Sequence, residues 1–201
     1  MKVNLLLTIL TAGLLASCAT TARYGPATQP ESIEYYQTHL DVYPGNVRKV
    51  PSQYANVHVA WAGIIVSNDA TDEDLNGKIR MATVFEHHYF DWEQNRQDGG
   101  LRLLISPRGE GRFRMRWQMS RKAQDASADD AMKYAAPGKL AIVYGTPESV
   151  DEDGTIVLRY HYVRIFGPAQ FRENELDYGR RSETYDANKA TPGAATNSPS
   201  R

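Results

Sequence analysis

Apolar and polar residues alternate along much of the chain, which is the pattern of β-strands that bury one face. The clearest example is RFRMRWQM, residues 112–119, where apolar side chains occupy the odd positions and polar side chains the even ones. Similar runs predict strands at residues 57–67, 78–90, 101–106, 139–145 and 155–165. Trp61 and Trp117 lie on the apolar faces of their strands, so we expect both in the core. Gly63, in the middle of the first strand, predicts a bulge or a sharp bend.

Residues 30–40, PESIEYYQTHL, have helical rather than strand character. They predict a short helix that Ser32 caps. Its predicted buried face consists of Ile33, Tyr36, Gln37 and Leu40. We interpret this helix as a cover over one open end of the domain, and the alternative is that Tyr35 and Tyr36 stack on a ligand.

A second helix is predicted at residues 126–138, capped by Ser127 and ended by Pro137 and Gly138. It lies before the last two of about six strands, so strands and helices do not alternate as they do around a parallel sheet. The pattern therefore predicts a mainly β domain, built as a small, curved antiparallel barrel.

The N-terminus has the layout of a secretory signal, with a lysine at position 2, an apolar run and then small residues. As a helix the run would be about 20 Å long, short of the ~30 Å hydrocarbon core, so it is a poor permanent span. The residues that close it, Leu15 to Cys18, resemble the lipobox of bacterial lipoproteins. The resemblance implies cleavage before Cys18, a diacylglyceryl thioether on its sulfur and an acyl chain such as palmitate on its new amino group. Ala19, in place of an aspartate, implies the outer membrane.

Cys18 is the only cysteine in the chain, so no disulfide can form within it. Two or more buried acyl chains anchor a protein stably to a membrane, and we therefore predict that Cys18 is a lipid anchor. The alternative is an incidental cysteine after an ordinary signal peptide. The formal net charge of −1 argues against global attraction to nucleic acid or to anionic membranes, so any electrostatic function must be local.

Composition divides the chain into four parts. Residues 1–17 are the predicted lipoprotein signal peptide, and residues 18–40 are a lipidated tether that ends in the short helix. Residues 41–170 form the predicted barrel domain. Residues 171–201 are first charged and then small, polar and interrupted by proline, which predicts a disordered tail.

Five motifs follow the lipobox in order along the chain. They are VAWAGIIVS, EHHYFDW, GRFRMRW, PGKLAIVYGT and DGTIVLRYHYVRI. Together, over about residues 42–165, they resemble the Slp family of outer-membrane lipoproteins. The resemblance implies an OB-like barrel held at the outer membrane, with no established enzymatic activity.

The best candidate for catalytic or metal chemistry is the motif EHHYFDWE. It holds Glu86, His87, His88, Asp91 and Glu93. Adjacent histidines on a strand point to opposite faces, so both cannot bind one metal unless the strand has ended. We expect a solvated strand end, and the alternative is a metal site in which His88 and Glu86 share a face and Asp91 approaches after a turn.

No serine-histidine-acid order, phosphate loop or paired-cysteine motif is present in the sequence. We therefore predict a protein that is not an enzyme and that has no catalytic residues, no metal and no cofactor.

Arg112, Arg114 and Arg116 form a stripe on one face of a predicted strand, with guanidinium groups about 6.5 to 7 Å apart. Such a stripe must be solvated, paired with acids such as Glu86 or Glu110, or matched to an external anion. Lipid head groups, glycan phosphates or an acidic partner would supply that anion. Nucleic acid is not expected, because a secreted protein does not meet it and barrel shape alone is only an analogy.

Two functions remain open. The favoured one is a non-catalytic outer-membrane lipoprotein, anchored to the membrane by lipid, whose barrel binds or organises another component of the cell envelope. The alternative is an anchored module that binds an anionic small molecule, glycan or lipid head group along the arginine stripe.

Overall fold

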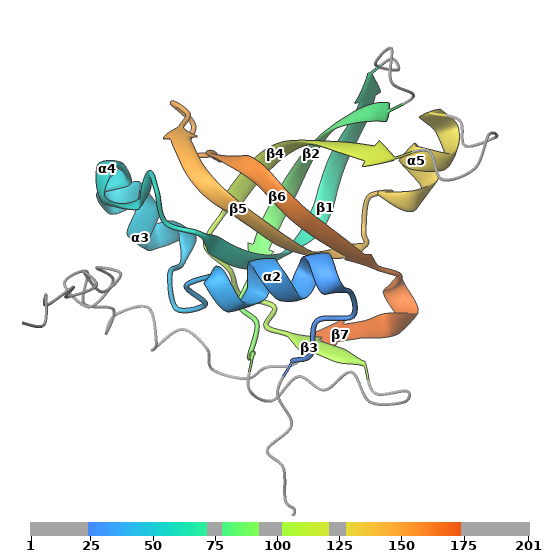
Figure 1. Cartoon of the computed structure of the whole chain (residues 1–201), viewed down its shortest axis with the longest axis horizontal. Coiled ribbons are helices and arrows are strands. Elements are labelled where there is room, and N and C mark those ends of the chain that lie inside the picture. Colours follow the sequence, from blue (N-terminus) through green and yellow to red (C-terminus); the bar gives the residue numbers. More distant parts are fainter. Residues whose placement is uncertain (1–23, 72–77, 93–101, 121–127, 174–201) are drawn as a thin grey trace, which may run out of the picture.

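The computed structural model describes residues 24–71, 78–92, 102–120 and 128–173. Within them the chain forms short helices near the start and a series of strands after residue 58 (Figure 1). The helices are α2 (Gln29–Gln37), α3 (Pro44–Lys49), α4 (Pro51–Tyr54), α5 (Ala128–Tyr134) and the 3-10 turn η1 (Pro168–Gln170). The strands are β1 (Val59–Thr71), β2 (Lys78–His88), β3 (Leu103–Ile105), β4 (Arg112–Ser120), β5 (Leu140–Val150), β6 (Ile156–Phe166) and β7 (Phe171–Glu173).

Five long strands form a closed barrel in the order β1, β2, β4, β6, β5 (Figure 1). Neighbours are antiparallel except β4 and β6, which run parallel from Phe113 opposite Ile156 to Arg116 opposite Arg159. The helix α5 lies in the chain between the third and fourth barrel strands. This is the arrangement of the OB fold, so the predicted mainly β, OB-like barrel is confirmed, with one parallel pair where only antiparallel pairing was expected.

The barrel interior is apolar, because the alternating side chains of its strands meet there. Trp61 and Trp117 are 1% and 5% exposed, which confirms that both are core residues. Each indole N–H has a partner: Trp61 donates to the carbonyl oxygen of Val42 at 2.7 Å, and Trp117 donates to Oγ1 of Thr83 at 2.8 Å. Both tryptophans therefore bury a large ring without leaving a polar atom unsatisfied.

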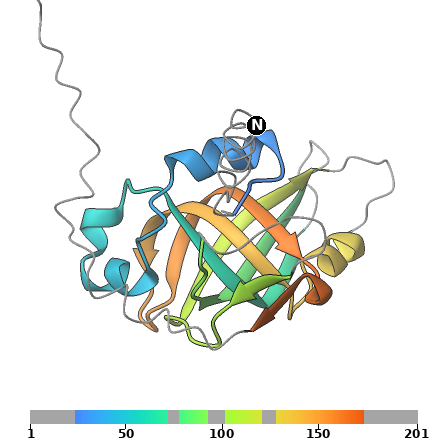
Figure 2. The same ribbon diagram turned by 90° about the horizontal axis from the view of Figure 1, so that it is seen from below.

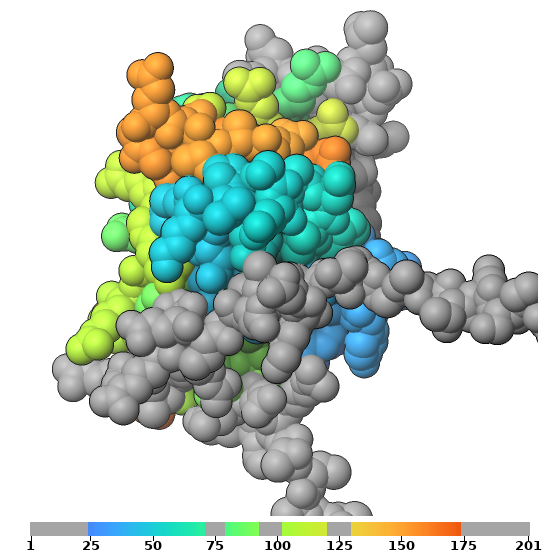
Figure 3. All heavy atoms as spheres, turned by 90° about the vertical axis from the view of Figure 1, so that its left-hand side faces the viewer, coloured from blue at the N-terminus to red at the C-terminus, as the bar shows by residue number. Residues whose placement is uncertain are grey.

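Helices close the two ends of the barrel. Val47 of α3 and Tyr54 of α4 pack into the core at one end, and Ala131 of α5 and Ala135, which follows α5, pack into it at the other. Figure 3 shows the first of these ends, where the side chains of α3 and α4 lie against the strands β5 and β6.

Gly63 does not mark a bulge, contrary to the prediction from its position in the strand. The irregularity of β1 lies further along, between Ile65 and Ser67. A Cβ atom on Gly63 would lie 2.8 Å from Cζ of Phe113 and 3.0 Å from Cβ of Phe85, which stack on each other inside the barrel. The glycine is therefore required by close packing of two rings rather than by a bend.

A second apolar layer covers part of the outside of the barrel. The outward residues of β1 and β5 are buried there together with side chains of α2, β3 and the chain around residue 90 (Figure 1; Figure 2). The members of this layer are Tyr24, Tyr35, Ala60, Ala62, Phe90, Trp92, Leu103, Ile105, Leu140, Ile142, Tyr144 and Phe166. Both faces of the first half of β1 and of β5 up to Pro147 are thus buried, which explains the unbroken apolar run in β5.

The helix α2 belongs to this outer layer and lies against the barrel wall at β6, not over an open end as expected. Its predicted buried face is also wrong, because Ile33 is 52% and Tyr36 is 81% exposed, whereas Glu31 and Tyr35 are buried. The cap is Thr28 rather than Ser32. Burial of Tyr35 leaves Tyr36 alone at the surface, so the two rings do not form an exposed stacking pair.

The side chain of Glu31 faces the barrel, where hydrogen-bond donors and an arginine lie close to its carboxylate. Its carboxylate accepts hydrogen bonds from the hydroxyl of Tyr24 at 2.5 Å and the backbone N–H of Ala27 at 2.8 Å. It also pairs with Arg164 of β6 at 3.2 Å. An acidic residue, rather than apolar residues alone, therefore determines which side of α2 faces the barrel. The spacing of apolar residues in the sequence does not predict this orientation.

The predicted strand at residues 101–106 exists as β3 but lies outside the barrel. It pairs in parallel with β7, which falls in residues expected to begin the disordered tail. Tyr24, within the predicted tether, is also packed: its ring meets Trp92 edge-on at 5.4 Å, and its N–H donates to the Trp92 carbonyl. The predicted signal peptide, residues 18–23 of the tether and residues 174–201 of the tail lie outside the described residues.

Candidate functional site

The arginine stripe lies on the outside of the barrel, on β4. Arg112, Arg114 and Arg116 are exposed, while Phe113 and Met115 between them are buried. The predicted alternation on this strand is confirmed, and the three guanidinium groups face solvent.

The neighbouring strands extend this basic surface. Arg159 of β6 is exposed and lies beside Arg116 in the parallel pair, and Arg80 of β2 is exposed opposite Gln118. Small or apolar side chains separate them, with Ala82 beside Arg116 and the half-exposed Val84 beside Arg114. We call the set Arg112, Arg114, Arg116 and Arg159 the arginine surface.

One member of the arginine surface has an ion-pair partner. Nη2 of Arg114 lies 3.0 Å from Oδ2 of Asp151, which follows β5, and both side chains are partly exposed. In the described ranges Arg116 and Arg159 form no ion pair, although their strands place them side by side. Each guanidinium is always charged, so these two arginines place two adjacent positive charges at the surface.

Among the described residues, neither of the two acids expected to neutralise the stripe forms an ion pair with it. Glu86 lies opposite Arg112 across β2 and β4, but no ion pair joins them in the described part of the chain. Glu110 turns away, accepting hydrogen bonds from the backbone N–H of Gly45 and, at 2.6 Å, from the hydroxyl of Tyr89.

The motif EHHYFDWE is not the solvated strand end that we expected, because several of its residues are buried. His87 is buried, and its Nδ1 accepts a hydrogen bond from the backbone N–H of Glu110 at 3.0 Å. His88 points to the other side of the strand, with Nδ1 2.8 Å from the carbonyl oxygen of Ser106. Glu86 is exposed and Asp91 is buried, while Glu93 lies outside the described residues. Among the described residues, this motif forms no cluster of three ligand atoms.

Burial lowers the pKa of His87 to about 3, with smaller contributions from the positive charges of His88 and Arg48. The ring is therefore neutral at physiological pH and serves as a buried hydrogen-bond acceptor. This role is structural rather than catalytic.

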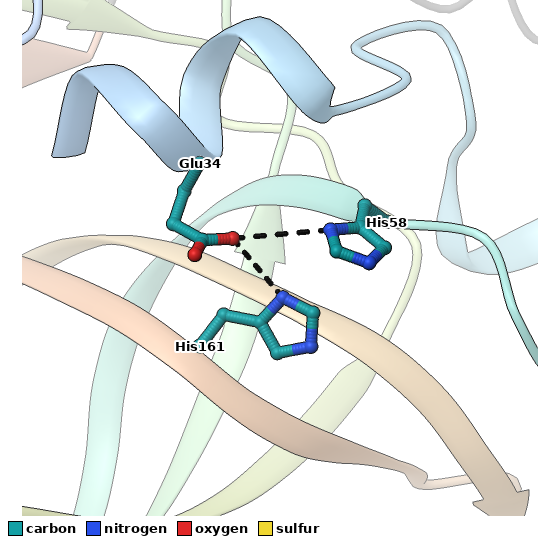
Figure 4. Close-up of side chains that lie close together, drawn as sticks. All are labelled: Glu34, His58 and His161. Carbon is teal, nitrogen blue, oxygen red and sulfur yellow. Dashed lines mark hydrogen bonds and ion pairs between the residues drawn. The ribbon is translucent and has the colours of Figure 1, made fainter. Parts of the chain in front are cut away.

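A different cluster, which the sequence did not suggest, forms between α2 and the barrel. Glu34 of α2, His58 immediately before β1 and His161 of β6 point toward one another (Figure 4). Oε2 of Glu34 lies 3.1 Å from Nδ1 of His161 and 3.8 Å from Nδ1 of His58. The two imidazole rings meet edge to face, with centroids 4.3 Å apart. We call these three residues the histidine-glutamate cluster.

The environment of the cluster is only partly open to water. Burial and the neighbouring His161 lower the pKa of His58, and the carboxylate of Glu34 partly offsets them. The other ring nitrogen of His161, Nε2, lies 3.2 Å from Oγ1 of the buried Thr146. Sequence reasoning missed the cluster because its members are far apart in the chain, and only the adjacency of α2, β1 and β6 brings them together.

The proposed anchor, Cys18, lies outside the described residues. Among the residues that are described, no helix has both the length and the apolar character needed to cross a membrane. A scan against models of protein families gives no match, and no curated protein matches the chain.

Proposed function

We propose that the chain is a non-catalytic outer-membrane lipoprotein, similar to the Slp family, whose barrel binds an anionic component of the cell envelope through the arginine surface. The observation that carries the proposal is that Arg112, Arg114, Arg116 and Arg159 are exposed, with one ion pair, from Arg114 to Asp151, within the part of the chain that the structure describes. A bound anion would relieve the repulsion between these guanidinium groups.

The position of the surface on the barrel supports this role. The second apolar layer covers the outside of β1 and β5, whereas the outside of β2 and β4 carries exposed polar residues. In OB folds generally the second and third barrel strands form the ligand face, and in this chain those strands are β2 and β4. This support is an analogy at the level of the fold.

The shape of the surface favours a large partner over a small one. The arginines lie on the outer, convex side of a barrel wall, whereas small molecules usually bind in concave pockets. A polyanionic surface in the envelope, such as the phosphorylated glycolipid of an outer membrane, can instead meet several arginines at once. The lipid anchor would hold the barrel within reach of such a surface.

The test measures binding of residues 19–201, which lack Cys18, to vesicles that contain phosphorylated glycolipid. In the test variant, Arg112, Arg114 and Arg116 are replaced by glutamine. The control variant replaces Lys49, Arg102 and Arg172 by glutamine, which removes the same charge from exposed positions elsewhere. Thermal unfolding should change little in either variant, since exposed charges contribute about 0–1 kcal/mol each.

We expect the test variant to lose at least about tenfold in affinity, and the control variant to bind as the unmodified chain does. Binding of the unmodified chain should weaken as salt is raised, because salt screens exposed charges. Equal binding of the two variants would contradict a role for the arginine surface. Neutral vesicles that bind equally well would contradict recognition of an anion.

A further inference from the structure

We propose that the histidine-glutamate cluster is a zinc site, with the Nδ1 atoms of His58 and His161 and Oε2 of Glu34 as ligands. These residues lie on three separate segments, and one ligand atom from each lies within 4.8 Å of the others. Within the described ranges they are the one group of three or more histidine, cysteine or acidic side chains arranged in this way.

The distances suit a metal ion. Two ligands at about 2.0–2.1 Å from zinc lie about 3.3 Å apart at a tetrahedral angle. Oε2 of Glu34 lies 3.1 Å from one Nδ1 atom and 3.8 Å from the other, so the expected separation falls between the two observed ones. Figure 4 shows the three side chains pointing toward one another, so an ion between them would meet one ligand atom of each.

His58 supplies an independent observation. Its Nδ1 atom is buried and has no hydrogen-bond partner among the described residues, since Oε2 of Glu34 at 3.8 Å is too distant. A buried polar atom without a partner costs free energy. The contact with the Glu34 carboxylate at 3.8 Å leaves this nitrogen without a hydrogen bond, whereas a zinc ion would bind it directly.

The surroundings of His161 match the way zinc-binding histidines are held. Such a histidine donates its second ring N–H to another group, which fixes the orientation of the ring. Here Nε2 of His161 lies 3.2 Å from Oγ1 of Thr146, a fully buried side chain. Glu34 is also well placed, because Glu31, one helical turn earlier, ties α2 to Arg164 of β6.

The donor set indicates which ion would bind. Two imidazole nitrogens and one carboxylate oxygen are typical ligands of zinc, and three protein ligands leave a fourth position for water or an external ligand. The side chains of His161, Glu34 and His58 are 15%, 22% and 35% exposed, so an ion can enter from solvent. Once bound, it would link α2 to the start of β1 and to β6.

The experiment titrates zinc into the full chain carrying Cys18→Ser, so that the thiol does not bind the metal. The chain is kept in detergent, and binding is measured by isothermal titration calorimetry. In this background, His58→Gln, His161→Gln and Glu34→Gln each remove one proposed ligand. His88→Gln is the matched control, because His88 is half-buried like His58 but lies on β2, outside the cluster.

We expect one zinc ion per chain and a loss of at least about tenfold in affinity for each of the three variants. His88→Gln should bind as the parent does. X-ray absorption of the zinc complex should show nitrogen and oxygen ligands at about 2.0–2.2 Å. Added zinc should raise the melting temperature of the parent but not that of His58→Gln.

Absence of saturable zinc binding by the folded parent would overturn the proposal. So would binding that His58→Gln leaves unchanged, because a plain pair of Glu34 and His161 does not need His58. Calorimetry is informative even where a variant loses stability, since circular dichroism shows at each titration whether the chain is folded.

Discussion

At the scale of single residues, the buried histidine His87 shows how position decides the chemistry of a side chain. His88 is the next residue in the chain, yet the two histidines lie on opposite faces of β2 and have different hydrogen-bond partners. His87 accepts a hydrogen bond from a backbone N–H, so its neutral form is built into the folded state. The sequence predicted the opposite faces correctly, because that follows from strand geometry alone.

This environment makes stability depend on pH. In the folded protein the pKa of His87 is about 3, while in the unfolded chain it is about 6.5. Between these values the unfolded state binds a proton that the folded state does not, so stability falls as pH falls below about 6.5. The slope due to this one group is about 1 kcal/mol per pH unit.

We expect His87→Gln to destabilise the protein at pH 7, because the ring fills a buried site, but to remove this part of the pH dependence. Urea unfolding at pH 7 and at pH 4.5 measures the difference in stability between variant and parent, which should be smaller at the lower pH. A difference that stays constant with pH would show that His87 takes up its proton as readily in the folded state as in the unfolded one.

At the scale of elements, α2 is positioned by the buried pair of Glu31 and Arg164. Glu31 is fully buried. Burial of the Tyr24 hydroxyl raises its pKa above the ordinary value, and the negative charge of Glu31 raises this pKa further. Removing one member of a buried pair leaves the other charge without compensation, which is more damaging than removing both.

We therefore expect Arg164→Met to destabilise the protein by about 2–4 kcal/mol, since it leaves the buried Glu31 carboxylate without its positively charged partner. The double variant Glu31→Gln/Arg164→Met should be less destabilised than the sum of the single variants, with a coupling of about 1–3 kcal/mol. Chemical unfolding of the four proteins measures this cycle. Strictly additive losses would mean that the pair does not hold the helix.

The same helix shows where sequence reasoning stops. The strands of the barrel follow from alternation, because every second residue of β4 enters the core. The buried face of α2 could not be found in this way, since its key inward residue, Glu31, is an acid that depends on partners far away in the chain. A usable signal did exist in β5, whose unbroken apolar run indicates that a second layer covers its outer face.

At the scale of the whole molecule, the two candidate sites depend differently on topology. Three of the four members of the arginine surface lie on β4 and could be predicted from the sequence, whereas Arg159 on β6 and the ion pair of Arg114 required the structure. The histidine-glutamate cluster needs α2 packed on β6 and the first residues of β1 nearby, which no local pattern reveals. Long-range pairing of strands is thus what separates the predictable site from the unpredictable one.

The second apolar layer covers one side of the barrel, and the arginine surface is exposed on another. The proposed anchor would bring the arginine surface close to the membrane. A protein tethered by lipid at Cys18 would present its arginine surface to the envelope at a high effective concentration, so even weak binding would be sufficient. Membrane anchoring by Cys18 and anion binding by the arginine surface are then separate properties, and substitutions can remove each one without the other.

We expect Cys18→Ser either to release the protein from the membrane or to leave it with an uncleaved signal, because the apolar run is too short to be a stable span. Membrane fractionation at high salt, with mass spectrometry of the N-terminus, measures both outcomes. The matched control is the variant with glutamine at positions 112, 114 and 116, which should remain in the membrane fraction with its lipid attached. A Cys18→Ser protein that is cleaved and still sediments with membranes at high salt would show that another part of the chain holds it there, and the lipoprotein proposal would then be wrong.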